Sequence, residues 1–228
     1  MISIAIPTFE SHGNGWLYLS ELLNSISTQT FTDYQVIIAD QSNDDKVKKL
    51  CNFYDNIMNI SYYDSTHIPK GNSTNANYAI SKCTSDKIKI IFQDDLFVDN
   101  RGLEYFNNCF ENNANWIVSG SFYCEDKYFL TDSMVPVYTN DIWTGNNLIS
   151  SPSVLAFRTK HYFDENLIML TDCDLYKRFY HLYGPPTIIT NPIIYNRKHK
   201  NQMAKHYLHL LKTEVEYLKL KYEREKIL

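Results

Sequence analysis

The sequence predicts an α/β fold in which a mostly parallel central sheet is flanked by helices and followed by a C-terminal helix. Three observations favour this class. Short apolar runs that suit strands alternate with segments of helical periodicity, which is typical of βαβ units. The strand-like runs are apolar throughout, as strands are when helices cover both faces of a parallel sheet. At 228 residues, with 44% hydrophobic side chains and no linker or repeat, residues 1–228 are expected to form one domain.

The first half of the chain supplies most of the predicted sheet. Its opening β-branched run is expected to stop at Pro7, which has no backbone N–H for a central ladder. Apolar side chains between Trp16 and Ile26 then recur at helical spacing. Strands are predicted at residues 2–6, 35–39, 60–63 and 88–92, and helices around residues 16–26, 44–56 and 75–82.

The second half is less regular. Its predicted elements are a helix at 101–113, strands at 116–119, 153–158 and 187–189, and a helix from near Asp172. A charged helix from about Gln202 closes the chain, and its apolar side chains form one stripe. We expect this stripe to pack onto the domain, and a homodimer seam is the alternative use.

Composition and cysteine usage exclude several classes of protein. Lys and Arg number 22 against 26 Asp and Glu, a net charge of −4 that gives no basic footprint for nucleic acid. No stretch approaches the roughly 20 apolar residues that span a bilayer, and the first residues do not resemble a signal peptide. The five cysteines are odd in number and lack C-x-x-C spacing, so a reducing, cytoplasmic location is expected.

Acidic residues follow three of the predicted strands. Glu10 comes after the first strand, Asp40 after the second, and Asp94 and Asp95 after the fourth. The carboxyl ends of parallel strands meet at one edge of a sheet, where ligands bind in open α/β folds. Carboxylate oxygens suit Mg²⁺ or Mn²⁺, which usually take one or two of them together with substrate phosphates. The alternative is that these residues only cap helices.

The motifs of residues 2–100 resemble glycosyltransferase family 2. The resemblance rests on their order and spacing as well as on their sequences. They are Ile4-Ala5-Ile6-Pro7-Thr8-Phe9-Glu10, Leu22…Ser25-Ile26…Gln29-Thr30-Phe31, Val36-Ile37-Ile38-Ala39-Asp40-Gln41-Ser42, Gly71-Asn72-Ser73-Thr74-Asn75-Ala76-Asn77-Tyr78-Ala79-Ile80 and Phe92-Gln93-Asp94-Asp95.

The resemblance implies a GT-A fold and metal-dependent, inverting transfer of a sugar from a nucleotide-diphosphate sugar to an acceptor hydroxyl. It implies Mn²⁺ or Mg²⁺ as cofactor, favours a UDP-sugar as donor, and leaves a glycan or another hydroxyl compound as acceptor. Residues 1–100 then form the nucleotide-sugar half, 101–200 the acceptor half and 201–228 the C-terminal helix.

By position in these motifs, the resemblance also assigns site residues. Asp40 is expected to hydrogen-bond the base, Asp94 to approach the ribose or sugar, and Asp95 to hold the metal. His199 is placed where some family members have a histidine that reaches the metal or diphosphate, although a solvated basic loop is the alternative. The remaining nucleotide-binding residues by this resemblance are Pro7, Thr8, Phe9, Glu10 and Asn77.

The acceptor half resembles the family at Leu170-Thr171-Asp172-Cys173-Asp174-Leu175, where Asp172 takes the place of the catalytic base. Such a base must reach the attacking hydroxyl within about 3 Å or through one water. The alternative is a helix cap. The preceding polar stretch lies where the family lines its sugar and acceptor pocket, and its candidates are Trp143, Asn146 and Asn147. Buried packing is the equal alternative for Trp143.

Two other functions stay open at the level of sequence. A sugar nucleotidyltransferase also presents carboxylates to a metal, but its first loop is rich in glycine and basic residues, unlike Pro7–Glu10. A catalytically degenerate nucleotide-sugar-binding domain is the other, because Ala76, Gln93 and Thr171 depart from the family pattern.

Overall fold

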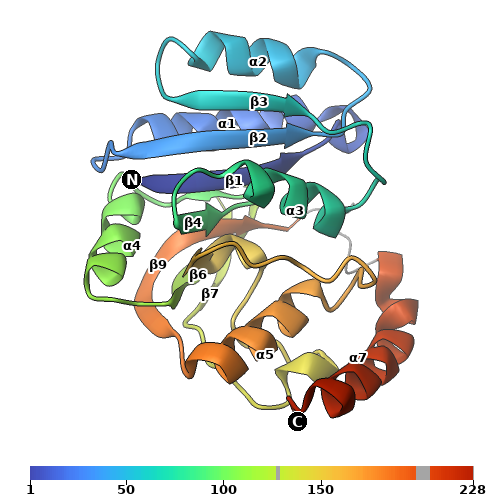
Figure 1. Cartoon of the computed structure of the whole chain (residues 1–228). Coiled ribbons are helices and arrows are strands. Elements are labelled where there is room, and N and C mark those ends of the chain that lie inside the picture. The colour runs from blue at the N-terminus through green and yellow to red at the C-terminus, as the bar shows by residue number, and fades with distance from the viewer. Residues whose placement is uncertain (127–128, 199–205, 228) are drawn as a thin grey trace.

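The computed structural model describes residues 1–126, 129–198 and 206–227. In its first half, parallel strands alternate with helices, as the sequence predicts, with small shifts at the element ends (Figure 1). The elements are β1 (Ile2–Thr8), α1 (Gly15–Ser27), β2 (Tyr34–Asp40), α2 (Lys46–Tyr54), β3 (Ile60–Asp64), α3 (Asn72–Lys82) and β4 (Lys87–Ile90).

The chain after β4 contains two strands that the sequence did not predict, β5 (Leu96–Phe97) and β7 (Phe129–Met134). The C-terminal helix is described as α7, whereas the start predicted near Gln202 falls on residues 199–205, which lie outside the described part of the chain. The other elements are α4 (Gly102–Glu111), β6 (Trp116–Asp126), β8 (Leu155–Arg158), α5 (Thr171–Tyr183), β9 (Thr187–Arg197) and α7 (Leu211–Glu225). Short 3-10 turns lie at Ser11–Gly13, Ile142–Thr144, Pro152–Val154 and Leu208–Leu210.

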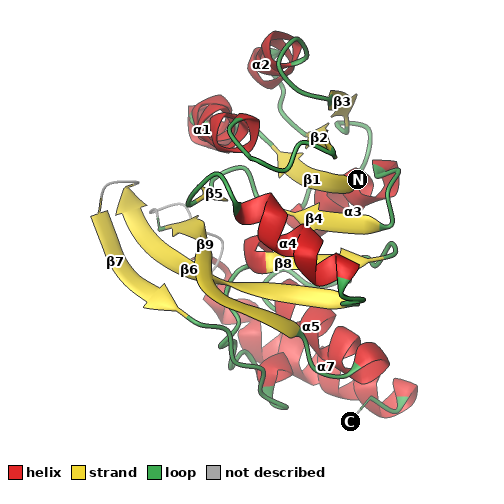
Figure 2. Cartoon of the chain, turned by 90° about the vertical axis from the view of Figure 1, so that its left-hand side faces the viewer, coloured by secondary structure: helices red, strands yellow, loops and turns green. Residues whose placement is uncertain are grey.

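The described strands form one continuous sheet in the order β3-β2-β1-β4-β8-β6-β9-β5, with β7 paired to β6. The strands from β3 to β4 are parallel, whereas β8 runs antiparallel to both β4 and β6. Helix α3 packs on β1 and β2, and α1 and α2 lie together on the other face of this parallel part (Figure 2). The predicted α/β class is therefore confirmed, with a mixed second half.

Two prolines lie within strands without breaking the sheet. Pro7 is in β1, beyond Ala5, where the pairing with β4 ends, so its missing N–H removes no hydrogen bond to that strand. Pro192 pairs with Gly120 at an irregularity in the β6–β9 register. A side chain at Gly120 would come within 2.6 Å of the carbonyl oxygen of Thr190, so the bulge requires glycine there. This bulge lets β9 continue past the proline to Arg197.

The apolar stripe of α7 packs onto the rest of the chain. Leu218 and Tyr222 are fully buried, and the ring of Tyr222 meets Trp143 edge to face at 5.9 Å. The homodimer seam through this helix stays a prediction. Among the described residues, no helix combines the length and the apolar character needed to cross a bilayer.

Candidate active site

A cavity of about 820 Å³ lies where β1, β4 and β9 end and where α3 and α5 begin. Asp94 and Asp95 line it after β4, and Asp172 lines it in the first turn of α5. The chain folds so because parallel β1 and β4 end at the same edge of the sheet, while β9 ends beside them. Carboxylates separated by about a third of the chain thus share one cavity.

Asp95 is held by backbone and hydroxyl donors. One carboxylate oxygen accepts a hydrogen bond from the backbone N–H of Arg197 at 3.0 Å, and the other accepts from Ser151 Oγ at 3.5 Å. The side chain is buried. Burial, followed by repulsion from the Asp94 charge, raises the pKa of Asp95 to about 7. A bound cation would relieve both causes, because it favours the charged form of the pair.

A buried lysine that sequence reasoning missed lies on β4, below this pair. Lys89 is fully buried, and its Nζ donates hydrogen bonds to the carbonyl oxygens of Ile90, Ser153 and Leu155. Burial lowers the pKa of Lys89, and the charge of Asp95 opposes that change. Lysine and isoleucine alternate in β4. A charged residue inside a strand with both faces covered was the signal in the sequence that could have indicated this buried lysine.

The turn after β1 forms another part of the cavity, as its predicted role requires. Pro7, Phe9 and Glu10 line it. The Gln93 side-chain amide exchanges two hydrogen bonds with the Phe9 backbone, at 2.9 and 3.0 Å, which fixes this turn against the end of β4. Within the described part of the chain, Glu10 Oε2 is buried and has no hydrogen-bond partner. An unpaired buried carboxylate oxygen in a cavity suits a hydroxyl or N–H donor of a ligand.

Asp40 and Thr8 lie behind the cavity lining. Asp40 is 1% exposed, and its carboxylate accepts hydrogen bonds from Thr8, Tyr62 and the backbone N–H of Ser42. Burial raises the pKa of Asp40, and the bond to Ser42 leads the contacts that oppose this change. In this structure Gln41, the next residue, lines the cavity instead. Asp40 does not line the cavity in this structure, and its contact with a nucleotide base stays a prediction.

Asp172 is half-buried and well oriented. One carboxylate oxygen accepts from Asn147 Nδ2 at 2.8 Å, and the other accepts from the backbone N–H of Cys173 at 2.9 Å. Burial raises the pKa of Asp172 to about 6, against the lowering effect of these bonds. A carboxyl with a pKa near neutrality is matched to proton uptake in catalysis.

A chain of polar side chains joins the two carboxylate centres. Asn147 bonds Asp172 and both backbone groups of Ser150. Ser150 Oγ accepts from Asn196 Nδ2 at 2.8 Å, and Asn196 in turn accepts from Ser151, which bonds Asp95. Ser150 is buried and has φ 107°, a strained conformation for a residue with a side chain. The polar residues Asn147, Ser150 and Ser151 thus orient the carboxylates of the site through hydrogen bonds.

Three predicted site residues, Trp143, Asn146 and Asn77, do not line this cavity, and their roles in the site stay predictions. Trp143 packs on Tyr222, Asn146 is exposed and bonds Asp141 at 3.0 Å, and Asn77 bonds Glu165 and both backbone groups of Phe163. Asn147 does not line the cavity either. Its amide oxygen and nitrogen are both bonded within the protein, and it reaches the site only through its bond to Asp172. Spacing along the chain does not determine which way a loop side chain points. His199 lies outside the described residues.

Basic side chains also line the cavity. They are Arg197, His12, Lys70 and His206. Arg197 is held by an ion pair to Glu21 at 2.5 Å. The positively charged Arg197 and Lys70 side chains are suited to the negative charge of a diphosphate.

The carboxylates present fit a divalent ion that completes its shell from a substrate. Within the described ranges, no group of three His, Cys, Asp or Glu side chains is gathered that would hold an ion by itself. Asp94 and Asp95 do line the cavity together. Mg²⁺ and similar ions are commonly bound by one or two carboxylates plus substrate phosphates and water.

Comparison with known proteins identifies the fold and the family. TarS residues 1–349 from S. aureus match with a TM-score of 0.69 at 20% identity, covering 93% of this chain and 64% of that one. The same fragment in complex with UDP-GlcNAc matches with a TM-score of 0.70 at 18% identity, with coverage of 93% and 66%. The mannosyltransferase PcManGT from Pyrobaculum calidifontis, in complex with GDP-Man and Mn²⁺, gives 0.64 at 16% identity, with coverage of 92% and 60%.

This chain therefore spans somewhat less than two thirds of the length of these neighbours, which share its GT-A fold. A search of curated proteins found no match to its sequence. The sequence profile described as glycosyl transferase family 2 matches residues 3–180, most of the chain and both carboxylate centres. The chain belongs to glycosyl transferase family 2.

Proposed function

We propose that this protein transfers a sugar from a nucleotide-diphosphate sugar to an acceptor hydroxyl with inversion at the anomeric carbon. The observation that carries the proposal is that Asp95 and Asp172 line one cavity although they are far apart in the sequence. Asp95 lies in a strand-end acidic pair suited to an ion and a diphosphate. Asp172 has an oriented carboxylate whose pKa is raised to about 6. Family membership supports the same reaction.

In the proposed mechanism, the residues of the chain bind, orient and move one proton. The acceptor hydroxyl gives its proton to Asp172 while its oxygen forms a bond to the anomeric carbon. The bond from that carbon to the diphosphate oxygen breaks on the opposite face, and its electrons leave with the diphosphate. Asn147 keeps the Asp172 carboxylate aimed at the cavity. Arg197 and Lys70 contribute positive charge to the same cavity.

A divalent ion, Mn²⁺ or Mg²⁺, is proposed to bind at Asp95 with help from Asp94. When bound, such an ion offsets the charge that builds on a departing diphosphate. The mannosyltransferase neighbour contains Mn²⁺ together with GDP-Man, which supports this cofactor. His199 stays a proposed additional ligand or phosphate contact.

The donor is proposed to be a UDP-sugar. TarS binds UDP-GlcNAc, whereas the mannosyltransferase binds GDP-Man, so a test must include both bases. The buried, unpaired Glu10 Oε2 is suited to a hydroxyl or N–H of the nucleoside. The acceptor is proposed to be a glycan or another hydroxyl compound.

A two-stage experiment tests this function. Thermal unfolding is first measured with UDP, GDP and their sugars, with and without Mn²⁺, because a bound ligand raises apparent stability by mass action. Nucleotide diphosphate release is then measured with the donors that bind, with water as the acceptor. We expect metal-dependent stabilisation and slow release of UDP. Stabilisation without any release favours a degenerate binding domain, and release of pyrophosphate from a nucleoside triphosphate favours a nucleotidyltransferase.

A further inference from the structure

Side chains of helix α7 hydrogen-bond the segment that carries Asp172, which we call the base segment (residues 163–174). The carboxylate of Glu214 on α7 is buried and accepts hydrogen bonds from three consecutive backbone N–H groups. These belong to Ile168 at 2.9 Å, Met169 at 3.0 and 3.2 Å, and Leu170 at 2.9 Å. Leu170 is the residue directly before α5, so the last of these hydrogen bonds lies two residues from Asp172.

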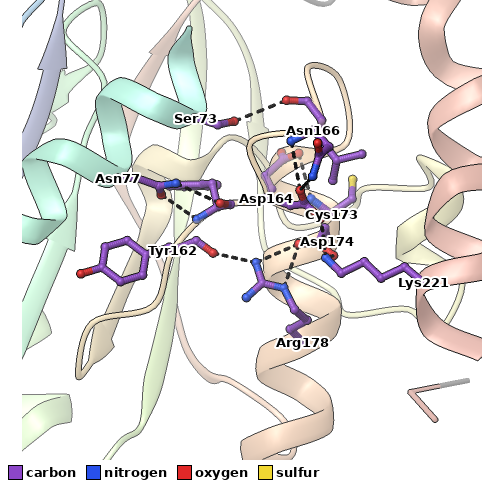
Figure 3. Close-up of polar contacts among 12 residues, drawn as sticks. Ser73, Asn77, Tyr162, Asp164, Asn166, Cys173, Asp174, Arg178 and Lys221 are labelled. Atoms are coloured by element: carbon purple, nitrogen blue, oxygen red, sulfur yellow. Dashed lines mark hydrogen bonds and ion pairs between the residues drawn. The ribbon is translucent and has the colours of Figure 1, made fainter. Parts of the chain in front are cut away.

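The same helix also holds both ends of the base segment. Lys221 Nζ donates to Asp164 at 2.7 Å and to Asp174 at 2.8 Å. Tyr217 donates to Asp164 at 2.9 Å and Tyr222 donates to Asp174 at 3.0 Å. Figure 3 shows Asp174 between Lys221 from α7 and Arg178 of α5, and both pair with its carboxylate. Burial opposes ionisation of Asp164, but the bonds led by Lys221 outweigh it and lower its pKa to about 2.

These contacts supply what α5 lacks locally. The first N–H groups of a helix need partners, usually from a capping side chain in the preceding residue. The residue before α5 is Leu170, and no side-chain cap bond is made there. Glu214 supplies a partner from another helix for the N–H of this cap residue, Leu170, and for the two N–H groups before it, while the N–H of Cys173 in the first turn is bonded by Asp172 itself. A carboxylate beside a helix start is also favoured by the helix dipole. A buried carboxylate is costly without such bonds, so its position and that of the N–H groups are fixed together.

The other side of the base segment is attached to α3, which borders the cavity. Asn77 donates to the Phe163 carbonyl at 2.9 Å and accepts from the Phe163 N–H at 2.7 Å. The segment is therefore held between α3 and α7, and its own residues Ile168, Met169 and Asp172 line the cavity.

We propose that α7 is a positioning element for the catalytic base, with Glu214 as its main positioning residue. This inference rests on the proposed function, in which Asp172 takes the acceptor proton. Glu214 does not line the cavity, so it acts by fixing the start of α5 and, through it, the direction of the Asp172 carboxylate. The C-terminal helix thus belongs to the catalytic architecture as well as to the core.

The test compares Glu214→Gln with Glu216→Gln, which changes an exposed residue on the same helix and serves as the matched control. Three quantities are measured: amide hydrogen exchange, the pKa of Asp172 by carboxyl carbon NMR, and UDP or GDP release from the sugar nucleotide that stabilises the wild type. We expect Glu214→Gln to raise exchange of residues 168–173 at least tenfold and to shift the Asp172 titration. It should lower kcat at least tenfold while the donor KM stays within twofold. The control should match the wild type.

The proposal is overturned if the increase in exchange stops at Leu170 and both the Asp172 titration and kcat match the wild type. If Glu214→Gln does not fold, Tyr217→Phe removes one bond to Asp164 without leaving a hole, and a smaller change of the same kind is expected. A wild type that turns over no sugar nucleotide contradicts the proposed function alone, because exchange and the Asp172 titration still decide whether α7 positions this carboxylate.

Discussion

The two carboxylate centres of the cavity are built differently. Asp95 follows a buried strand of the parallel sheet and is held by the backbone of β9. Asp172 lies at the start of a helix and is held by a side-chain amide from an irregular loop, Asn147. Burial raises the pKa of both groups, to about 7 and about 6. The strand-end group sits beside a like charge and is suited to a cation, whereas the helix-start group is suited to a proton.

The first prediction separates the two centres by their effect on turnover. Asp172→Asn removes the proton acceptor but keeps the size of the side chain and one of its two accepted hydrogen bonds. A general base typically contributes 10²–10⁴-fold, so we expect nucleotide diphosphate release with acceptor or water to fall by about that factor. The affinity for UDP or GDP with Mn²⁺ should change little. Normal turnover by this variant would show that Asp172 is not the base.

The second prediction addresses the strand-end centre. Asp95→Ala should abolish the Mn²⁺-dependent part of nucleotide binding, because it removes the carboxylate proposed to hold the ion. Thermal shift with UDP or GDP checks this result, and the wild type treated with a chelator should behave in the same way. Asp132→Ala, an exposed carboxylate on β7, is the control and should retain the shift. A full Mn²⁺-dependent shift in Asp95→Ala contradicts the assignment.

The third prediction uses the raised pKa of Asp172. Turnover should rise with pH through about 6 and level off above it, since the base must be ionised. The sign for stability is the reverse. Between about pH 4 and 6 the folded state binds more protons than the unfolded state, so this group lowers stability as pH rises. In urea unfolding, the stability of Asp172→Asn relative to the wild type should therefore increase from pH 4 to pH 7, because the variant lacks this titrating group.

The fourth prediction concerns a residue outside the cavity and should have the smallest effect on catalysis. Trp143→Ala removes a half-buried indole ring that packs against Tyr222, so the free energy of unfolding should fall by about 1–3 kcal/mol. The donor KM should stay unchanged at a temperature where the variant is folded. A large rise in donor KM would restore Trp143 as a sugar contact.

The contrast between the centres also explains what the sequence could predict. The strands that carry Pro7–Glu10, Asp40 and Asp94–Asp95 are continuous apolar runs, and their parallel pairing brings their ends to one edge. Asp172 was found through a resemblance at a helix start. β5 and β7 were missed because one spans only Leu96–Phe97 and the other is a short strand of mixed polarity at the margin of the sheet.

The direction of some side chains could not be predicted from spacing. Asn77, Trp143 and Asn146 bond or pack against Phe163, Tyr222 and Asp141 and do not line the cavity. Lys89 and Glu214 were missed for the related reason that their partners are backbone groups distant in the sequence. A pattern of residue types cannot reveal such partners, because they are defined only when the chain has folded.

The most direct test of the proposed metal and nucleotide site is a crystal of the protein grown with Mn²⁺ and UDP or GDP, with the manganese located from its anomalous signal. We predict the ion in contact with the Asp95 carboxylate, the nucleotide in the cavity beside Glu10, and the Asp172 carboxylate directed into the same cavity. Manganese and nucleotide bound elsewhere, with Asp95 still bonded only to Arg197 and Ser151, would contradict it.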